Sequence, residues 1–203
     1  MKAYAALPKG YIKTRSIDLQ KDKKTALIVN GVALAICAVM IAAMAFIVPI
    51  RSLIDFDNGD AGMAETLARV MIMLAGSLIY IVLHELTHAA AMKVVGCKKV
   101  RFGFTGIYAY AGSPGEYFDK PAYIFISLAP LVLFGVIFIV LQFTVPKTWF
   151  WVIWIWQIAN VSGAAGDIYV SFLTASLPKT VIASDDGVSM TYYDIDPEST
   201  EGK

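Results

Sequence analysis

The sequence predicts a mostly α-helical, polytopic membrane protein with about four transmembrane helices and short β-hairpins on the cytoplasmic side. Composition is the first indication, because 58% of the 203 residues are hydrophobic and only 16% are charged. A typical soluble domain has about 25% charged residues. The second indication is four apolar segments that are each long enough to cross a hydrocarbon core of about 30 Å. The third is an uneven distribution of lysine and arginine between the segments, which sets an orientation.

Residues 1–25 form a basic N-terminal segment, and we expect it to be cytoplasmic. Its basic residues are Lys2, Lys9, Lys13, Arg15, Lys21, Lys23 and Lys24. Within it, Tyr11 to Leu19 is a candidate strand. An uncharged apolar segment follows from Ala26 to Ile50. This segment is longer than the apolar core of a signal peptide, which is about 7–15 residues, so we expect it to be retained as a membrane anchor.

The other predicted spans run from Val70 to Val95, from Tyr123 to Phe143 and from Trp149 to Leu177, which gives a four-span core at residues 26–177. The loop before the second span mixes two basic residues with acidic ones. The end of the second span and the loop after it carry Lys93, Lys98, Lys99, Arg101 and Lys120. Because cytoplasmic loops carry an excess of lysine and arginine, we expect this second loop and both termini to be cytoplasmic.

Two segments outside the spans have the pattern of β-hairpins. The first lies within residues 97–120, where Val100 to Ala111 alternates and is rich in Phe, Tyr and Gly. The second, Val181 to Ile195, has a turn at Asp185-Asp186-Gly187 and belongs to an acidic C-terminal segment at residues 178–203. We expect the tail from Glu198 to Lys203 to be disordered. The charge of the C-terminal segment suggests that it covers the cytoplasmic mouth of a site as an autoinhibitory element.

The chain has only two histidines, and both belong to the H-E-x-x-H motif His84-Glu85-Leu86-Thr87-His88. Residues four apart share one face of a helix, so both imidazoles can reach one metal ion. Glu85 lies one step round the helix, where its carboxylate can act as a general base on a metal-activated water. Because the motif lies inside an apolar span, the sequence indicates a zinc hydrolase within a membrane.

A catalytic zinc needs a third protein ligand and one open position. No third histidine exists, so the ligand must be Asp, Glu or Cys. Besides Glu85, Asp167 is the one charge well inside a span, and such charges are costly and usually functional. Its depth of about 15 Å from the cytoplasmic end matches depths of about 12 Å for His88 and about 18 Å for His84. We therefore predict His84, His88 and Asp167 as the zinc ligands.

Other roles and ligands stay open at this point. Asp167 could instead make a structural hydrogen bond or relay protons. Glu116 and Asp119, in the second loop, are rival ligands. Cys97 lies too far along the helix axis from His88 to join the same ion, so we expect a buried thiol.

The expected chemistry uses the zinc ion to lower the pKa of a bound water toward about 7. Glu85 would accept the water's proton and pass it to the leaving amine. Asn160 lies two helical turns before Asp167 on the same face. It could hydrogen-bond an extended substrate backbone or simply bridge helices. Val100 to Ala111 is a candidate strand for pairing with an unwound substrate by β-addition.

A membrane span with H-E-L-T-H-A-A, followed two spans later by N-x-x-G-A-x-G-D from Asn160 to Asp167, resembles the putative zincin peptidase family. These are small multi-pass bacterial membrane proteins, and the resemblance covers about residues 65–180. The arrangement is more distantly similar to that of site-2 proteases, the intramembrane metalloproteases. The resemblance implies that His84, His88 and Asp167 are ligands, that Glu85 is the base and that Asn160 positions substrate. The chain departs from the site-2 pattern, with Gly-Asp-Ile in place of Asp-Gly and no PDZ-like domain.

We therefore expect a membrane-embedded zinc metallopeptidase of the bacterial cytoplasmic membrane, acting on membrane or membrane-proximal proteins. One alternative is a zinc hydrolase with a substrate that does not span the membrane. Another is a metal-dependent membrane scaffold without activity, in which Glu85→Gln would keep full function. The expected partners are the lipid bilayer and a membrane-protein or peptide substrate, while the oligomeric state stays open. A net charge of +1 gives no indication of nucleic-acid binding.

Overall fold

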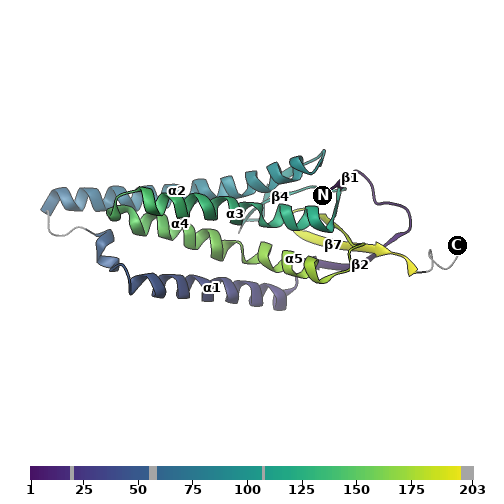
Figure 1. Cartoon of the computed structure of the whole chain (residues 1–203), viewed down its shortest axis with the longest axis horizontal. Coiled ribbons are helices and arrows are strands. Elements are labelled where there is room, and N and C mark those ends of the chain that lie inside the picture. The colour runs from purple at the N-terminus through teal and green to yellow at the C-terminus, as the bar shows by residue number, and fades with distance from the viewer. Residues whose placement is uncertain (19–20, 55–58, 107, 198–203) are drawn as a thin grey trace. The chain divides into compact units, whose positions relative to one another are not determined.

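Three helices are long and apolar enough to cross a membrane in the computed structural model, which describes residues 1–18, 21–54, 59–106 and 108–197. They are α1 (Lys23–Ala45), α2 (Gly59–Val94) and α3 (Lys120–Thr144) (Figure 1). The chain is mostly helical, with small antiparallel sheets, as the sequence predicts. The tail from Glu198 to Lys203, for which we expected disorder, lies outside the described residues.

The predicted fourth span is divided into two shorter helices, α4 (Phe150–Gly163) and α5 (Ala165–Ser176). The interruption is at Ala164, whose ψ of 10° departs from helical geometry. Gly163 and Gly166 flank this point, and glycine is a poor helix former. Neither helix reaches the 18 residues of a spanning candidate, so the count of four spans is not confirmed. Two short 3-10 helices, η1 (Ile50–Leu53) and η2 (Lys147–Trp149), complete the helical elements of the described residues.

Polar contacts fix the helix ends near the sheet. Asp119 precedes α3, and its Oδ1 accepts a hydrogen bond of 2.9 Å from the backbone N–H of Ala122, which satisfies a free donor of the first turn. At the end of α2, Gly96 has a φ of +95°. The N–H of Cys97 then bonds to the carbonyl of Met92 at 3.0 Å, and that of Gly96 to Lys93 at 3.0 Å. This is a Schellman motif, in which glycine tolerates the left-handed conformation that ends the helix.

The chain forms two compact units. One comprises residues 1–29, 84–129 and 166–203, and the other comprises residues 30–83 and 130–165. The boundaries fall inside helices α1, α2, α3 and α5. These units describe packing, whereas the predicted segments 1–25, 26–177 and 178–203 describe position relative to a membrane, so that division stays a prediction.

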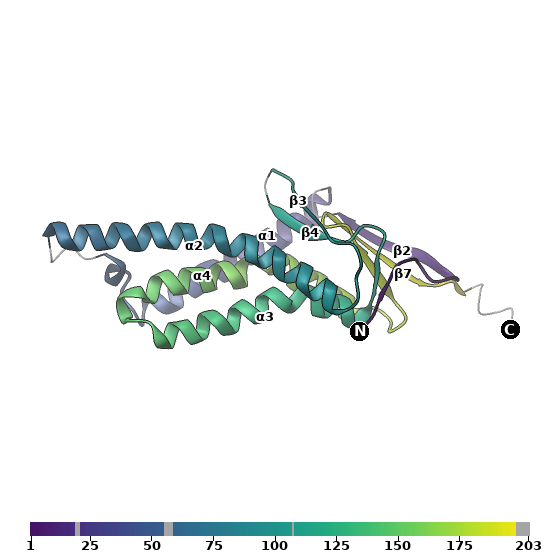
Figure 2. The same ribbon diagram turned by 90° about the horizontal axis from the view of Figure 1, so that it is seen from above.

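The first unit contains a five-stranded antiparallel sheet in the order β1-β5-β6-β7-β2. Its strands are β1 (Ala3–Tyr4), β2 (Tyr11–Asp18), β5 (Tyr117–Asp119), β6 (Ile182–Asp185) and β7 (Ser189–Ile195). β2 and β7 run side by side in both views (Figures 1 and 2). The same unit holds the separate hairpin of β3 (Arg101–Phe104) and β4 (Ala109–Gly112). Both predicted hairpins and the predicted strand near the N-terminus are therefore present.

The C-terminal hairpin has a position that its charge did not indicate. β6 and β7 occupy the middle of the sheet, between β5 and β2, and Tyr192 of β7 has no solvent exposure. Residues 182–195 are therefore a structural part of the first unit. The predicted autoinhibitory role stays a prediction, and a truncation after Thr180 would not test it because it would also remove these two strands from the sheet.

Each unit has its own hydrophobic core. In the first, Phe118 of β5 and Tyr192 of β7 pack with Met92 of α2 and Val170 of α5. In the second, Tyr80 packs edge-to-face on Phe134, with ring centroids 5.3 Å apart. The core of the first unit holds the ends of α2, α3 and α5 against the sheet, in the unit where the predicted metal ligands lie.

Candidate metal centre

Helix α2 places the two histidines of the motif on one face. The ring centroids of His84 and His88 are 4.8 Å apart, and their Nε2 atoms are separated by 3.2 Å. Their spacing of four residues produces this directly, because 3.6 residues complete one turn. The pairing of the imidazoles is thus a local property of the helix.

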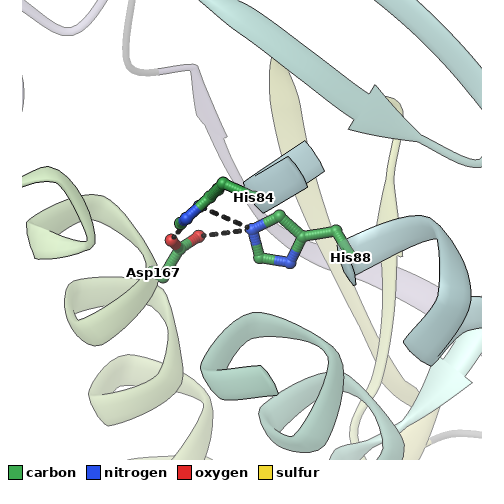
Figure 3. A group of neighbouring side chains, drawn as sticks. All are labelled: His84, His88 and Asp167. Atoms are coloured by element: carbon green, nitrogen blue, oxygen red, sulfur yellow. Dashed lines mark hydrogen bonds and ion pairs between the residues drawn. The ribbon is translucent and has the colours of Figure 1, made fainter. Parts of the chain in front are cut away.

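Asp167 lies in the first turn of α5, just after the interruption at Ala164. Its Oδ2 is 3.3 Å from Nε2 of His84, and its Oδ1 is 3.5 Å from Nε2 of His88. Figure 3 shows the carboxylate and both imidazoles pointing toward one another. The free N–H groups at the start of a helix favour a carboxylate in this position.

These three side chains form a cluster of His and Asp that could hold a metal ion. It is the cluster of this kind found within the described ranges 1–18, 21–54, 59–106 and 108–197. One ligand atom from each lies within 4.8 Å of the other two. The structure thus brings together the three residues that we predicted as ligands, all from the first unit. Their role in holding a metal stays a prediction.

The geometry fits a zinc ion. Zinc binds imidazole nitrogen and carboxylate oxygen at about 2.0–2.2 Å in a tetrahedral arrangement, which places neighbouring ligand atoms about 3.4 Å apart. The observed separations of 3.2, 3.3 and 3.5 Å cluster around this value. Two nitrogens and one oxygen are also a donor set of catalytic zinc sites, where the fourth position is left for water or substrate.

The second ring nitrogen of His88 has a defined partner. Nδ1 lies 2.9 Å from the backbone carbonyl oxygen of Ile126 in α3, in a buried environment. A carbonyl oxygen can only accept, so Nδ1 carries a hydrogen, and Nε2 is the nitrogen that faces Asp167 and the proposed metal position. Sequence reasoning did not find this contact, because the acceptor is a backbone atom on another helix.

Glu85 is half-buried and stands outside the ligand cluster. The backbone N–H of Ala111 in β4 hydrogen-bonds to its carboxylate. The first unit therefore brings β4 against the second residue of the motif.

The rival ligands have other partners. Oε1 of Glu116 accepts hydrogen bonds of 3.1 Å from the backbone N–H groups of Lys98 and Lys99, which fixes the connection from α2 to β3. Asp119 caps α3, as described above. Cys97 is buried, as we predicted, and its thiol hydrogen-bonds to the carbonyl of Lys99 at 3.1 Å. Glu116 and Asp119 are not part of the cluster found within the described residues.

Asn160 lies in the second unit and is fully buried. Its Oδ1 accepts a hydrogen bond of 3.0 Å from the Tyr80 hydroxyl, and its Nδ2 donates one of 3.1 Å to the carbonyl of Leu131. These contacts match the alternative in which Asn160 bridges helices, here α2, α3 and α4. Its predicted role in positioning substrate stays a prediction.

Asp185, which the sequence indicated only as a turn residue, ends strand β6 and has a carboxyl group with defined partners. Its Oδ2 accepts a hydrogen bond of 2.8 Å from the hydroxyl of Tyr123, and its Oδ1 accepts one of 2.8 Å from the N–H of Gly187. Desolvation raises the pKa of Asp185 to about 6, although both hydrogen bonds act in the opposite direction. The acidic hairpin thus places one carboxyl group in the interior of the first unit.

Comparisons with known proteins agree with the composition of this centre. A family model described as "putative zincin peptidase" matches residues 77–182, slightly more than half of the chain. The matched region contains the H-E-x-x-H motif, the β3–β4 hairpin and Asp167. No curated protein and no solved structure matches the chain. The chain belongs to the putative zincin peptidase family, a description that indicates a zinc metallopeptidase.

Proposed function

We propose that the protein is a membrane-embedded zinc metallopeptidase that hydrolyses peptide bonds in membrane or membrane-proximal protein substrates. The observation that carries the proposal is the cluster of His84, His88 and Asp167, whose separations suit a tetrahedral zinc ion. The family match supports the class of reaction.

The proposed roles follow from the donor atoms. Nε2 of His84, Nε2 of His88 and a carboxylate oxygen of Asp167 would hold zinc, which when bound polarises the scissile carbonyl and acidifies water. Glu85 takes one proton from the attacking water while the water oxygen forms a bond to the carbonyl carbon. As the C–N bond breaks, Glu85 delivers that proton to the leaving nitrogen. The hydrogen bond from Ala111 orients the Glu85 carboxylate for both transfers.

The proposed position in the membrane uses three apolar helices and the pair α4–α5. Helices α1, α2 and α3 meet the length and hydropathy requirements by themselves. We propose that α4 and α5 cross together as an interrupted fourth span. A break in a membrane helix is tolerated where the segment is covered by protein, and it frees the first turn of α5 to present Asp167. We propose that both termini are cytoplasmic, because the excess of lysine and arginine lies in the N-terminal segment and in the loop after α2.

The outer edge of β4 is suited to bind an extended substrate. Thr105 N–H bonds to the carbonyl of Tyr108 across the hairpin, at 3.0 Å. Along an antiparallel ladder, hydrogen-bonded residue pairs alternate with pairs that are not hydrogen-bonded. Ala109 and Ala111 belong to the second kind, so their backbone N–H and C=O groups point away from β3. The contact between the Ala111 N–H and Glu85 agrees with this alternation. A substrate strand added at this edge would run past the general base, within reach of the metal ligands.

Zinc content and cleavage together test the proposed function. The purified wild-type protein should contain about one zinc per chain, because a three-ligand site with an open position holds a single ion. His84→Ala and Asp167→Ala should lose the zinc, and Glu85→Gln should keep it. The matched control is Glu116→Gln, which should also keep zinc because Glu116 is not part of the cluster.

Cleavage is measured by enriching new peptide N-termini after the reconstituted protein is incubated with isolated bacterial membranes. New N-termini should form with the wild type and be absent with Glu85→Gln. Wild-type protein that takes up no zinc would exclude the metallopeptidase. Equal cleavage by the wild type and Glu85→Gln would exclude Glu85 as the base.

Substrate addition at β4 has its own variant pair. Ala109→Pro removes the outward N–H of Ala109, whereas Ala109→Gly keeps it. We expect Ala109→Pro to reduce cleavage and to keep zinc, with Ala109→Gly close to the wild type. Full cleavage by Ala109→Pro would show that this edge does not bind the substrate.

A further inference from the structure

Helix α3 contains a proline four residues after the carbonyl that contacts His88. Pro130 lies inside α3 and is fully buried. In an α-helix the N–H of each residue bonds to the carbonyl four positions earlier, so the residue at position 130 would serve the carbonyl of Ile126. Proline has no N–H, and its ring pushes against that carbonyl. The Ile126 oxygen therefore lacks its usual partner within the helix.

The same carbonyl receives the hydrogen of His88 Nδ1, at 2.9 Å. Proline in a helix interior is destabilising, partly because it leaves a carbonyl without a donor. Here a side chain from another helix supplies the donor. Pro130 therefore leaves the Ile126 carbonyl free of a helical partner, and this free carbonyl in turn fixes the orientation of the His88 ring.

We infer that Pro130 is a positioning residue, which reserves the Ile126 carbonyl for His88 and thereby presents His88 Nε2 to the metal. The inference rests on the proposed zinc site. A histidine ligand needs its other nitrogen fixed, because the partner of that nitrogen sets both the tautomer and the ring orientation. Loss of such a partner typically weakens metal binding about 10- to 100-fold.

The decisive variant is Pro130→Ala, which returns an N–H to position 130 and lets the helix reclaim the Ile126 carbonyl. Pro121→Ala is the matched control in the same helix. Pro121 is exposed and lies in the first turn of α3, where an N–H has no partner within the helix in any case. A third variant carries an α-hydroxy acid at position 130, so that an ester replaces the amide. It has neither the N–H nor the proline ring.

Zinc affinity is measured by competition with a chromophoric chelator on the full chain in detergent micelles. We expect Pro130→Ala to bind zinc about 10- to 100-fold more weakly than the wild type. Pro121→Ala and the ester variant should bind like the wild type. Wild-type affinity in Pro130→Ala would overturn the inference. So would an equal loss in the ester variant, because the missing N–H would then not be the cause.

The zinc-free protein gives a second readout that does not need metal or activity. The chain has only two histidines, so ¹⁵N-histidine labelling gives spectra of His84 and His88 alone. We expect the Nδ1–H of His88 in the wild type to show the hydrogen bond to the Ile126 carbonyl, and Pro130→Ala to lose that hydrogen bond. An unchanged Nδ1–H signal in Pro130→Ala would overturn the inference. A wild type that binds no zinc would refute the proposed function, and the spectra would still decide the role of Pro130.

Discussion

Replacing Asp185 by asparagine should change how the stability of the first unit depends on pH. The side chain of Asp185 accepts hydrogen bonds from Tyr123 and Gly187, and desolvation raises its pKa from 3.8 to about 6. Asparagine has nearly the same shape and can still accept a hydrogen bond, but it does not titrate. The variant therefore separates the effect of the charge from the effect of packing.

The sign of the effect follows from proton binding. Well below pH 3.8 the carboxyl is protonated in both the folded and the unfolded chain, so Asp185 adds no pH dependence there. Between pH 4 and 6 the unfolded chain releases the proton while the folded chain still holds it, and stability therefore falls as pH rises. The total loss above pH 6 is about 3 kcal/mol for a pKa raised from 3.8 to about 6. This is an upper limit because Asp185 keeps some solvent contact. About 2 kcal/mol of the loss should fall between pH 4.5 and 7.

Hydrogen exchange of the β7 amides measures this effect, because their protection reports the opening free energy of the sheet. Relative to Asp185→Asn, the wild type should lose up to about 2 kcal/mol of protection between pH 4.5 and 7. Asp22→Asn is a control in which the pH dependence of stability should change in the opposite direction. Hydrogen bonds from Thr25 lower the pKa of Asp22, so its contribution is present above the unfolded pKa and is lost as pH falls through the folded one. Identical pH profiles for the wild type and Asp185→Asn would refute the interpretation of Asp185 as a desolvated acid.

Three further substitutions test the packing within each unit. Gly76→Ala should destabilise the second unit by about 1–3 kcal/mol in thermal unfolding, because the new Cβ would lie 2.2 Å from the ring of Trp156. Gly31→Ala, which meets nothing within 4 Å, should not destabilise it. Glu116→Ala should cost about 3 kcal/mol in chemical unfolding, since two backbone N–H groups lose a charged acceptor, while zinc content stays at the wild-type level. Loss of zinc in a folded Glu116→Ala protein would make Glu116 a ligand after all. Phe118→Ala should cost about 3–5 kcal/mol, because Phe118 has no solvent exposure, and a smaller loss would mean that the sheet closes around the cavity.

Much of the candidate site could be predicted from the sequence, because it depends on interactions within single helices and hairpins. The spacing of His84 and His88 places both imidazoles on one helix face in any α-helix. Asp167 could be selected because a charge inside an apolar span is expensive, and few such charges exist in this chain. The hairpins at Val100 to Ala111 and Val181 to Ile195 follow from alternation and turn residues, which act over a few positions.

The family match rests on the same kind of information. The matched residues 77–182 include the H-E-x-x-H motif and Asp167. Both are recognisable from residue type and spacing along the chain, without any knowledge of which segments pack together.

Contacts between segments that are distant in the chain could not be predicted from residue type and spacing. β1 and β5 are two and three residues long, too short to show a pattern, and they exist because each has a partner strand. Glu116 was a reasonable ligand by composition, but the fold turns it toward the backbone of Lys98 and Lys99. The charge of the C-terminal segment suggested a cover over the mouth of the site, and it gave no signal that strand pairing places β6 and β7 in the middle of the sheet.

The sequence by itself determined the residue types of the centre and the local geometry of its histidine pair, because helical periodicity and the cost of buried charge act within one segment. Tertiary structure alone decided that α5 brings the Asp167 carboxylate to the imidazoles, that Ala111 contacts Glu85, and that the Ile126 carbonyl receives His88. These contacts join segments that are 26 to 83 residues apart in the chain. They depend on how helices and strands pack, and packing is set by the whole core and not by any single stretch of sequence.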